Sequence, residues 1–180
     1  MDSVLSFEEV VLPHLNAAYR LARSLTETED DAQDIVQEAA LRAFRYFRTF
    51  SGGNGRAWFL RIVRHTCYDR YGHDVKRTGD AFDEEKHAAP QLTPEILLLH
   101  GENVSLVEDA MNELPTRFRE LLVLRELEGL SYQEVADALR IPIGTVMSRL
   151  SRARRALRRA LTAELDRQST FACGPRLSTT

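Results

Sequence analysis

Apolar residues recur at helical spacing along most of the chain, most clearly between residues 28 and 47. There they fall at i, i+3, i+4, i+7, i+8, i+11, i+12 and i+15, as Ala32, Ile35, Val36, Ala39, Ala40, Ala43, Phe44 and Phe47. This spacing predicts an amphipathic helix with one continuous apolar stripe. Thr28 is the expected N-cap, and acidic residues in the first turn suit the helix dipole.

Two further helices are predicted in the N-terminal half. Residues 7–25 carry apolar side chains spaced by three and four, but Pro13 lies inside, so the helix either starts near Pro13 or kinks there. Residues 51–55, which read SGGNG, predict a loop. A helix follows over residues 56–71, and its expected inner side carries Phe59, Ile62, Val63 and Thr66.

A second helical segment begins near residue 104. A short helix stops at Pro115, and the next ends with Gly129 in the C′ position. Ser131 and Glu134 form a capping-box pattern that opens another helix, which ends at residues 141–142. A final long helix starts near residue 143, and its expected inward residues are Ile143, Val146, Leu150, Ala153 and Leu157.

These patterns predict an all-α fold of two small helical domains, a three-to-four-helix bundle and a helix-turn-helix domain, joined by a flexible linker. Helical regularity fades between residues 72 and 102, and neither strand-like alternation nor an internal repeat is visible. The expected boundaries are 1–73 for the first domain, 74–102 for the linker and 103–165 for the second domain. Residues 166–180 are small and polar and include Gly174-Pro175, which predicts a disordered tail.

Composition places the chain among globular proteins. Of its 180 residues 43% are hydrophobic and 28% charged, which is enough to bury a core. The longest stretch without Asp, Glu, Lys or Arg covers only residues 10–19, half of a membrane span. Neither a signal peptide nor a disulfide framework is visible, since Cys67 and Cys173 lie far apart. We therefore expect a cytoplasmic protein with free thiols and no membrane insertion.

The charge distribution is more informative than the net charge of −3. Residues 27–38 hold six acids and no base, whereas residues 140–160 hold seven arginines and no acid. Alternating blocks of this size indicate several surfaces with different partners.

Residues 131–159 are the strongest functional signal. A capped helix, a turn of about four residues and a second helix with a polar outer face are typical of a helix-turn-helix. Early outward residues of the second helix are expected to reach base edges, and the later arginines to contact phosphates. The outward set is Thr145, Ser148, Arg149, Arg152, Arg155 and Arg159.

A second candidate is the tryptophan face of the helix over residues 56–71, formed by Trp58, Arg61, Arg64, His65 and Tyr68. Aromatic rings interleaved with cations are typical of surfaces that hold unstacked bases. The alternative is that Trp58 simply belongs to the core of the bundle.

A third candidate is the acidic face of the helix over residues 28–47. Its outer residues are Asp31, Asp34, Gln37, Glu38, Leu41 and Arg45. Such a face is either solvated or docks a basic protein partner, and its charge would repel DNA.

The sequence gives little support for a metal site, a bound cofactor or an enzyme activity. The histidines and cysteines lack metal-ligand spacing, and the loop at residues 51–55 lacks the lysine and preceding strand of a phosphate-binding loop. No paired nucleophile and base stands out, so we expect a non-enzyme without a cofactor.

Together these segments resemble the extracytoplasmic-function (ECF) sigma factors, small two-domain specificity subunits of bacterial RNA polymerase. Residues 31–45, DAQDIVQEAALRAFR, resemble region 2.2, and residues 56–70, RAWFLRIVRHTCYDR, are similar to regions 2.3 and 2.4. Residues 114–136, LPTRFRELLVLRELEGLSYQEVA, resemble the first part of region 4. The match continues over residues 144–155, GTVMSRLSRARR, which is the most specific of these strings.

The resemblance implies a role for each candidate surface. The acidic helix would dock on the clamp coiled coil of the largest polymerase subunit, and region 4 on the flap. The expected docking residues are Asp31, Asp34, Ile35, Gln37, Glu38 and Leu41. The −10 promoter element would be melted and held by Asn54, Arg56, Trp58, Arg61, Arg64, His65 and Tyr68, with Asn54 contacting a flipped base. The −35 element would be read by the outward residues of the helix-turn-helix, and Met147, where some relatives carry arginine, would offer only apolar contact.

The resemblance also implies an anti-sigma partner that covers the docking faces. The main alternative is an autonomous helix-turn-helix regulator, which would leave the tryptophan face and the acidic helix without a purpose. A thiol or metal sensor built on His65, Cys67 and Cys173 is a weaker alternative from another class.

Overall fold

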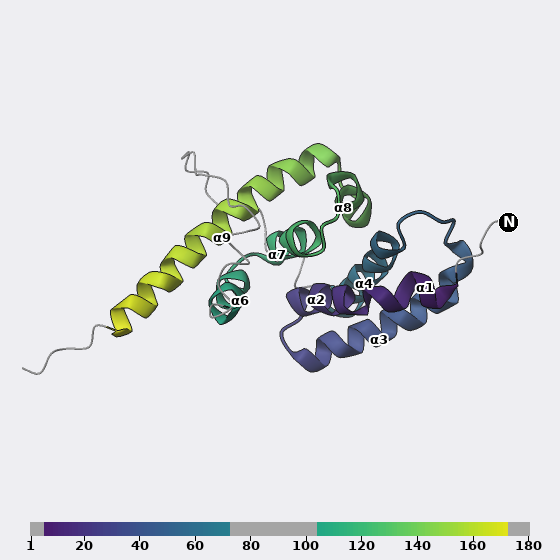
Figure 1. Cartoon of the computed structure of the whole chain (residues 1–180), viewed down its shortest axis with the longest axis horizontal. Helices are drawn as coiled ribbons and strands as arrows, with labels where there is room; N and C mark the ends of the chain where they lie inside the picture. The colour runs from purple at the N-terminus through teal and green to yellow at the C-terminus, as the bar shows by residue number, and fades with distance from the viewer. Residues whose placement is uncertain (1–5, 73–103, 173–180) are drawn as a thin grey trace, which may run out of the picture.

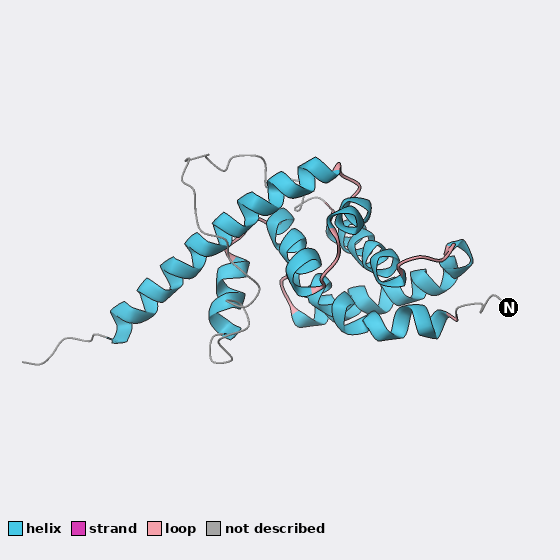
Figure 2. Cartoon of the chain, turned by 45° about the horizontal axis from the view of Figure 1, so that its top comes forward, coloured by secondary structure: helices cyan, strands magenta, loops and turns pink. Residues whose placement is uncertain are grey.

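The computed structural model describes residues 6–72 and 104–172, and the side chains as far as residue 167. Within these ranges every regular element is helical, as Figure 2 shows. The N-terminal unit contains α1 (Phe7–Val11), α2 (Leu15–Leu25), α3 (Glu29–Tyr46) and α4 (Gly55–Tyr71). The C-terminal unit contains α6 (Val104–Asn112), α7 (Thr116–Leu122), α8 (Tyr132–Leu139) and α9 (Ile143–Ala172).

Local sequence signals set the helix ends of the N-terminal unit. The Ser6 hydroxyl accepts a hydrogen bond from the Glu9 backbone N–H, and the Glu9 carboxylate accepts one from the Ser6 backbone N–H. Together the two hydrogen bonds cap α1. Pro13 lies in a 3₁₀ turn, Leu12–His14, that separates α1 from α2, so the predicted kink is confirmed. Thr28 caps α3 as predicted, accepting a hydrogen bond from the Asp31 backbone N–H.

The C-terminal unit follows its predicted signals closely. Gly129 has a φ of +63°, which suits its place in the turn after α7 and a π-helical turn, Val123–Leu127. The capping box between Ser131 and Glu134 opens α8. Arg140 ends α8 in the left-handed conformation, and α9 begins at Ile143, so the predicted helix-turn-helix is present.

Each unit buries an apolar interior. In the N-terminal unit α2, α3 and α4 pack against one another, with Leu21, Ile35 and Leu60 fully buried. In the C-terminal unit α9 is the long element against which α6, α7 and α8 pack, with Val146 and Leu150 facing inward. This burial of apolar stripes is the main stabilisation of such short helices.

The two units lie against each other (Figure 1). Helix α2 packs on α7 and on the π-helical turn, and α4 packs on α8. The linker expected over residues 74–102 lies outside the described residues. Contact between the units was not part of the sequence-based expectation, which placed two domains on a tether.

Three details differ from the sequence-based expectation. Helix α9 continues to Ala172, so the expectation of a non-helical tail from residue 166 is wrong as far as Ala172. No Gly or Pro interrupts residues 145–172, so the helix has no reason to end earlier. Phe44 and Ile143, expected to face inward, are exposed: Phe44 packs on Phe7 of α1, with ring centroids 5.3 Å apart, but keeps most of its surface open, and Ile143 is the first residue of α9.

Candidate nucleic-acid interface

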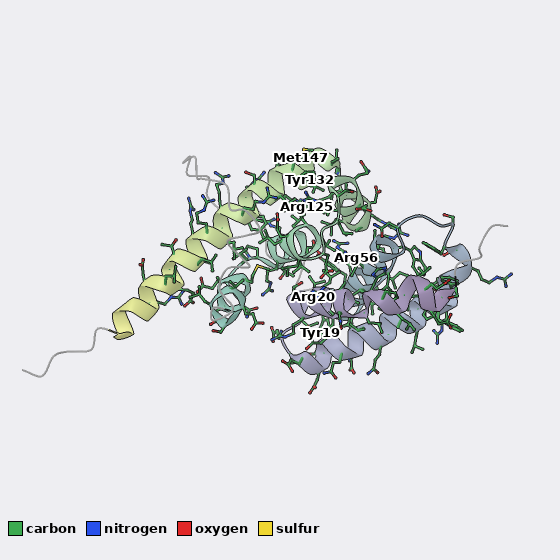
Figure 3. All side chains as sticks on the ribbon, in the orientation of Figure 1. Tyr19, Arg20, Arg56, Arg125, Tyr132 and Met147 are labelled. Atoms are coloured by element: carbon green, nitrogen blue, oxygen red, sulfur yellow. The ribbon has the colours of Figure 1, made fainter. Side chains whose placement is uncertain are left out.

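The first candidate surface is the exposed start of α9. Ser148, Arg152 and Arg159 are exposed, whereas Thr145, Arg149 and Arg155 are half-buried. Met147, labelled in Figure 3 near the start of α9, is 50% exposed beside them. The capped α8 and the turn at Arg140 set the direction of this end of α9, which buries Val146 and Leu150 and exposes its opposite side. Its first turns are therefore available to enter a major groove.

One arginine of α9 is used for packing. The Arg154 guanidinium donates to the Glu126 carboxylate from Nε at 2.9 Å and from a terminal nitrogen at 2.5 Å. Glu126 lies in the π-helical turn, so the acidic partner of Arg154 comes from another element and not from α9 itself. This ion pair fixes α9 on the π-helical turn.

The tryptophan face is not one continuous surface. Trp58 is half-buried and packs against Phe50 and Phe47, with ring centroids 5.2 and 6.2 Å away. It therefore belongs partly to an aromatic cluster that supports the loop before α4. Trp58 is thus partly a core residue, and its role towards unstacked bases stays a prediction.

The loop before α4 forms one wall of a hollow between the two units. Phe50, Asn54, Trp58 and Arg61 line it from the N-terminal unit, and Glu134 lines it from α8. Gly52 and Gly53 have φ values of +89° and +90°, which side chains with a Cβ rarely adopt. The loop conformation therefore depends on both glycines.

Asn54 has a structural role within the chain. Its side-chain oxygen accepts a hydrogen bond from the Ala57 backbone N–H at 3.1 Å and so caps α4. Its amide nitrogen donates to the Glu134 carboxylate across the hollow. In this structure the polar groups of Asn54 are thus engaged within the chain.

Arg64 and Tyr68 are covered by the C-terminal unit. The Arg64 Nε donates to the Glu120 carboxylate at 3.0 Å, and the Tyr68 hydroxyl donates to the same oxygen at 3.1 Å. The Arg64 guanidinium also lies 4.3 Å from the Tyr68 ring centroid. Burial raises the pKa of Glu120, and the two donors oppose that rise by stabilising its charged form.

Arg56 meets a second buried carboxylate. The Arg20 Nε donates to one oxygen of Glu128 at 2.6 Å, and a terminal nitrogen of Arg56 donates to the other. The Glu128 side chain is 0% exposed. Burial tends to raise its pKa, but the hydrogen bonds from the two arginines keep the pKa of Glu128 below its usual value. Figure 3 labels Arg20 and Arg56 on the side of the N-terminal unit that faces the C-terminal unit.

Sequence reasoning missed Arg20, Glu120 and Glu128. Their partners lie 52 to 108 positions away along the chain, so no local spacing brings them to attention. In the sequence, both glutamates look like ordinary charged residues on the solvent-exposed side of a helix. Only the packing of α2 and α4 against α7 and the π-helical turn reveals them.

His65 and Cys67 are the remaining candidate residues on α4. Burial, followed by the nearby charge of Arg140, lowers the pKa of His65. Cys67 is buried, and this burial raises its pKa to about 12. A protonated, enclosed thiol is a poor metal ligand and a poor nucleophile.

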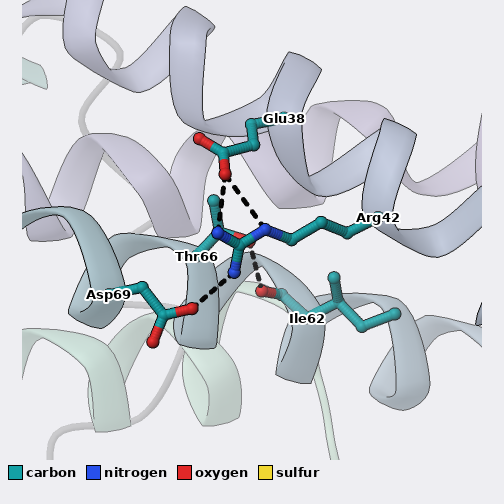
Figure 4. A network of polar contacts seen from close by, with 5 residues as sticks. All are labelled: Glu38, Arg42, Ile62, Thr66 and Asp69. Atoms are coloured by element: carbon teal, nitrogen blue, oxygen red, sulfur yellow. Dashed lines mark hydrogen bonds and ion pairs between the residues drawn. The ribbon is translucent and has the colours of Figure 1, made fainter.

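The acidic face of α3 is partly neutralised by neighbouring side chains. Tyr71 donates its hydroxyl to Asp31 at 2.6 Å, and Arg70 pairs with Asp34 at 3.0 Å. Arg42 bridges Glu38 and Asp69, as Figure 4 shows, and so ties α3 to α4.

Exposure separates the docking candidates on α3. Gln37 and Asp34 are exposed, and Leu41 is 61% exposed, so these three remain available to a partner. Ile35 is 0% exposed in the core between the helices, so its placement in the docking set is wrong. Its position on the apolar stripe already indicated the core.

Within residues 6–72 and 104–172 the side chains offer neither a candidate metal site nor a candidate membrane span. No three His, Cys, Asp or Glu side chains gather there as metal ligands would. No helix in the described part of the chain is both long and apolar enough to cross a membrane.

Comparison with family models identifies both units. Residues 10–76 match Sigma-70 region 2, and residues 105–157 match Sigma-70, region 4. Together these matches cover α2 to α4 and the C-terminal unit into the middle of α9.

Curated relatives carry matching names. The RNA polymerase sigma-H factor of Pseudomonas aeruginosa is 32% identical over 166 residues, covering 87% of this chain and 86% of the relative. The ECF RNA polymerase sigma-E factor of Escherichia coli is 35% identical, covering 71% and 72%. ECF RNA polymerase sigma factor SigE of Mycolicibacterium smegmatis is 32% identical, and the match spans 60% of its length.

Solved structures agree. The sigma factor RpoE, solved with the anti-sigma factor NepR from Bartonella quintana, is 30% identical, with a TM-score of 0.67 over 87% of this chain and 96% of that one. CnrH, solved with the cytosolic domain of CnrY, is 27% identical, with a TM-score of 0.61 over 87% and 88%. The chain therefore belongs to the ECF family of sigma-70-type RNA polymerase sigma factors.

Proposed function

We propose that this protein binds core RNA polymerase and directs it to a specific class of promoters. The observation that carries the proposal is the order of its two units. A region 2 unit, whose Trp58 lines a hollow shared with α8 of the next unit, is followed by a region 4 unit whose α9 presents polar side chains to solvent. The role is one of binding and positioning, without a catalytic step or a cofactor of its own.

Recognition of the −35 element is assigned to the start of α9. Ser148 and Arg152 are exposed there, and Arg152 is the side chain best suited to a bidentate contact with guanine. Thr145 and Arg149 lie on the same side and would enter the groove with them, and Arg155 and Arg159 would hold the duplex through phosphates.

Melting and capture of the −10 element are assigned to the loop before α4 and to α4 itself. Phe50 and Trp58 offer ring faces, and Arg61 lines the same hollow, which suits a base turned out of the duplex. Asn54 would contact that base once Glu134 is withdrawn, and Arg56, Arg64, His65 and Tyr68 would follow the strand.

Docking on core polymerase is assigned to the exposed part of α3. Asp34, Gln37 and Leu41 combine charge with an apolar side chain, the composition expected opposite a basic coiled coil of the largest subunit. Asp31 and Glu38 flank this patch. The C-terminal unit would meet the flap.

An anti-sigma partner is proposed from the neighbours RpoE and CnrH, which were solved with NepR and CnrY. Because the proposed work takes place on RNA polymerase, we also propose that the protein acts in the cytoplasm. The autonomous-regulator alternative is not favoured, because it leaves region 2 without a role.

A core-binding assay tests the proposal at its first step. Purified chain and core polymerase should elute together in gel filtration, and Asp34→Lys should weaken this complex while Asp34→Asn weakens it less. The control is Glu108→Lys, an exposed residue on α6 that receives the same charge change. Core binding that is absent, or equal in all four proteins, would contradict the assignment.

A further inference from the structure

Two large apolar side chains lie on the part of α9 assigned above to the major groove, and the −35 assignment gives them no role. Ile143 is 40% exposed and Met147 is 50% exposed. They are four residues apart on one helix, so they lie one turn apart on the same side. Single exposed apolar side chains are common on protein surfaces, but a neighbouring pair in the first two turns of a recognition helix would meet base edges directly.

The surroundings of Met147 leave room for a base. Val146, the residue before it, is fully buried, and Ser148, the residue after it, is exposed, so Met147 lies at the edge of the side of α9 that faces away from the core. Gly144 carries no side chain on this side. Beyond its two neighbours and the backbone of its own helix, no atom of the described residues lies within 4 Å of the place where a Cβ would be. A base edge can therefore approach α9 closely beside Met147.

The major groove offers one specific partner to an apolar side chain. All four base pairs present hydrogen-bond donors and acceptors there, and thymine alone adds a methyl group, at C5. The thioether of Met147 donates no hydrogen bond and accepts only weakly, while its rotatable bonds let it adapt to an irregular apolar contact. Ser148 and Arg152 supply the polar readout beside it. Met147 can therefore detect the methyl group, which hydrogen bonds cannot detect.

We infer that Met147 is a specificity-determining residue that contacts the C5 methyl group of a thymine in the −35 element, with Ile143 extending the apolar surface by one turn. This inference rests on the proposed function, because it deepens the role assigned to the start of α9. The contact discriminates by removing apolar surface from water, so its size follows from the methyl group. Burial of one such group corresponds to about a fourfold change in affinity.

Removal of single methyl groups from the promoter tests the inference. Holoenzyme is assembled from core polymerase and the full chain, and the probe is a fluorescein-labelled duplex of a promoter recovered by run-off transcription. Each thymine of its −35 segment, on either strand, is replaced in turn by uracil, which lacks only the C5 methyl group. At one thymine the replacement should weaken binding about fourfold. At the same position 5-methylcytosine should bind more tightly than cytosine by a similar factor, because it restores the methyl group.

The variant Met147→Ala identifies the side chain responsible. Met147 does not belong to the buried core, so this variant should fold, which circular dichroism and its thermal melting check. In Met147→Ala the uracil penalty at that thymine should disappear, while the effects of base changes elsewhere in the −35 segment remain. Leu127→Ala is the matched control, because Leu127 is a similarly exposed apolar residue in the π-helical turn, outside α9, and should keep the wild-type response to uracil.

The outcomes separate this inference from the proposed function. Wild-type binding that is unaffected by uracil at every position of the −35 segment would overturn the inference. An unchanged uracil penalty in Met147→Ala, or loss of the penalty in Thr145→Ser instead, would also overturn it, because the methyl group would then be read by another residue. Each of these results is compatible with a holoenzyme that transcribes normally. A wild type that directs no promoter-specific transcripts would overturn the proposed function, and this inference with it.

Discussion

Several side chains in this molecule combine a structural contact with a proposed contact to DNA. Asn54 caps α4 while facing the hollow, and Trp58 packs on Phe47 and Phe50 while lining the same hollow. Loss of activity on mutation of such residues can therefore come from either role. Stability has to be measured beside function at each of them.

Trp58 illustrates how the two roles separate. Trp58→Ala should lower the free energy of unfolding by about 1–3 kcal/mol, less than for a fully buried tryptophan, because the ring is only half-buried. Trp58→Phe keeps an aromatic ring against Phe50 and should retain most of this stability. Urea denaturation measures the loss, and permanganate footprinting of the melted promoter measures function. Closed-complex and open-complex binding reduced equally in Trp58→Ala would contradict a melting role.

Arg152 carries the residue-scale prediction for the −35 element. Arg152→Ala should weaken promoter binding by the holoenzyme by about 1–3 kcal/mol and relax the preference at a single base pair. Competition with promoters altered at one position measures both effects. Uniform weakening across all sequences would show that Arg152 contacts phosphate only.

Cys67 tests the sensor alternative. Burial raises its pKa to about 12, so at pH 8 the folded protein should hold this thiol protonated and out of reach. In a Cys173→Ser background, iodoacetamide should modify Cys67 in urea but scarcely at all in the native protein, as read by mass spectrometry. Rapid modification of the native protein would restore the thiol-sensor alternative.

At the scale of elements, the helix-turn-helix depends on a strained residue. Arg140 ends α8 with a φ of +55°, which costs a residue with a Cβ more than it costs glycine. Arg140→Gly should therefore stabilise the protein by about 0.5–1 kcal/mol, the strain relief being partly offset by the greater freedom of the unfolded chain. Chemical denaturation measures the change, and a loss of stability would show that the Arg140 side chain makes a contact outweighing the strain.

Elements were predictable wherever the signal is local. The caps at Thr28 and Ser131, the kink at Pro13 and the turn after Gly129 each depend on residues a few positions apart, and all of them are present. The helix end near residue 166 was misjudged, because composition alone does not stop a helix.

The site was only partly predictable. The exposed residues of α9 follow from helical periodicity, which fixes the side on which Ser148 and Arg152 lie. By contrast, the pairing of Arg64 with Glu120 joins residues 56 positions apart and leaves no trace in any local pattern. Periodicity also placed Arg64 on an open surface, because it carries no information about a second unit packed there.

At the scale of the whole molecule, described ion pairs between the two units join arginines of region 2 to glutamates of region 4. The net charge of −3 hides this, since it averages a basic region 2 side against the carboxylates of region 4. The anionic face of α3 would repel free duplex.

Run-off transcription tests the central claim most directly. Purified bacterial core RNA polymerase is supplied with a pool of fragments from the genome that encodes this protein, with and without the protein. The account predicts discrete transcripts only when the protein is present, with start sites that share a −35 and a −10 element. Absence of such transcripts, together with tight binding of promoter duplex by the protein alone, would contradict it and favour an autonomous regulator.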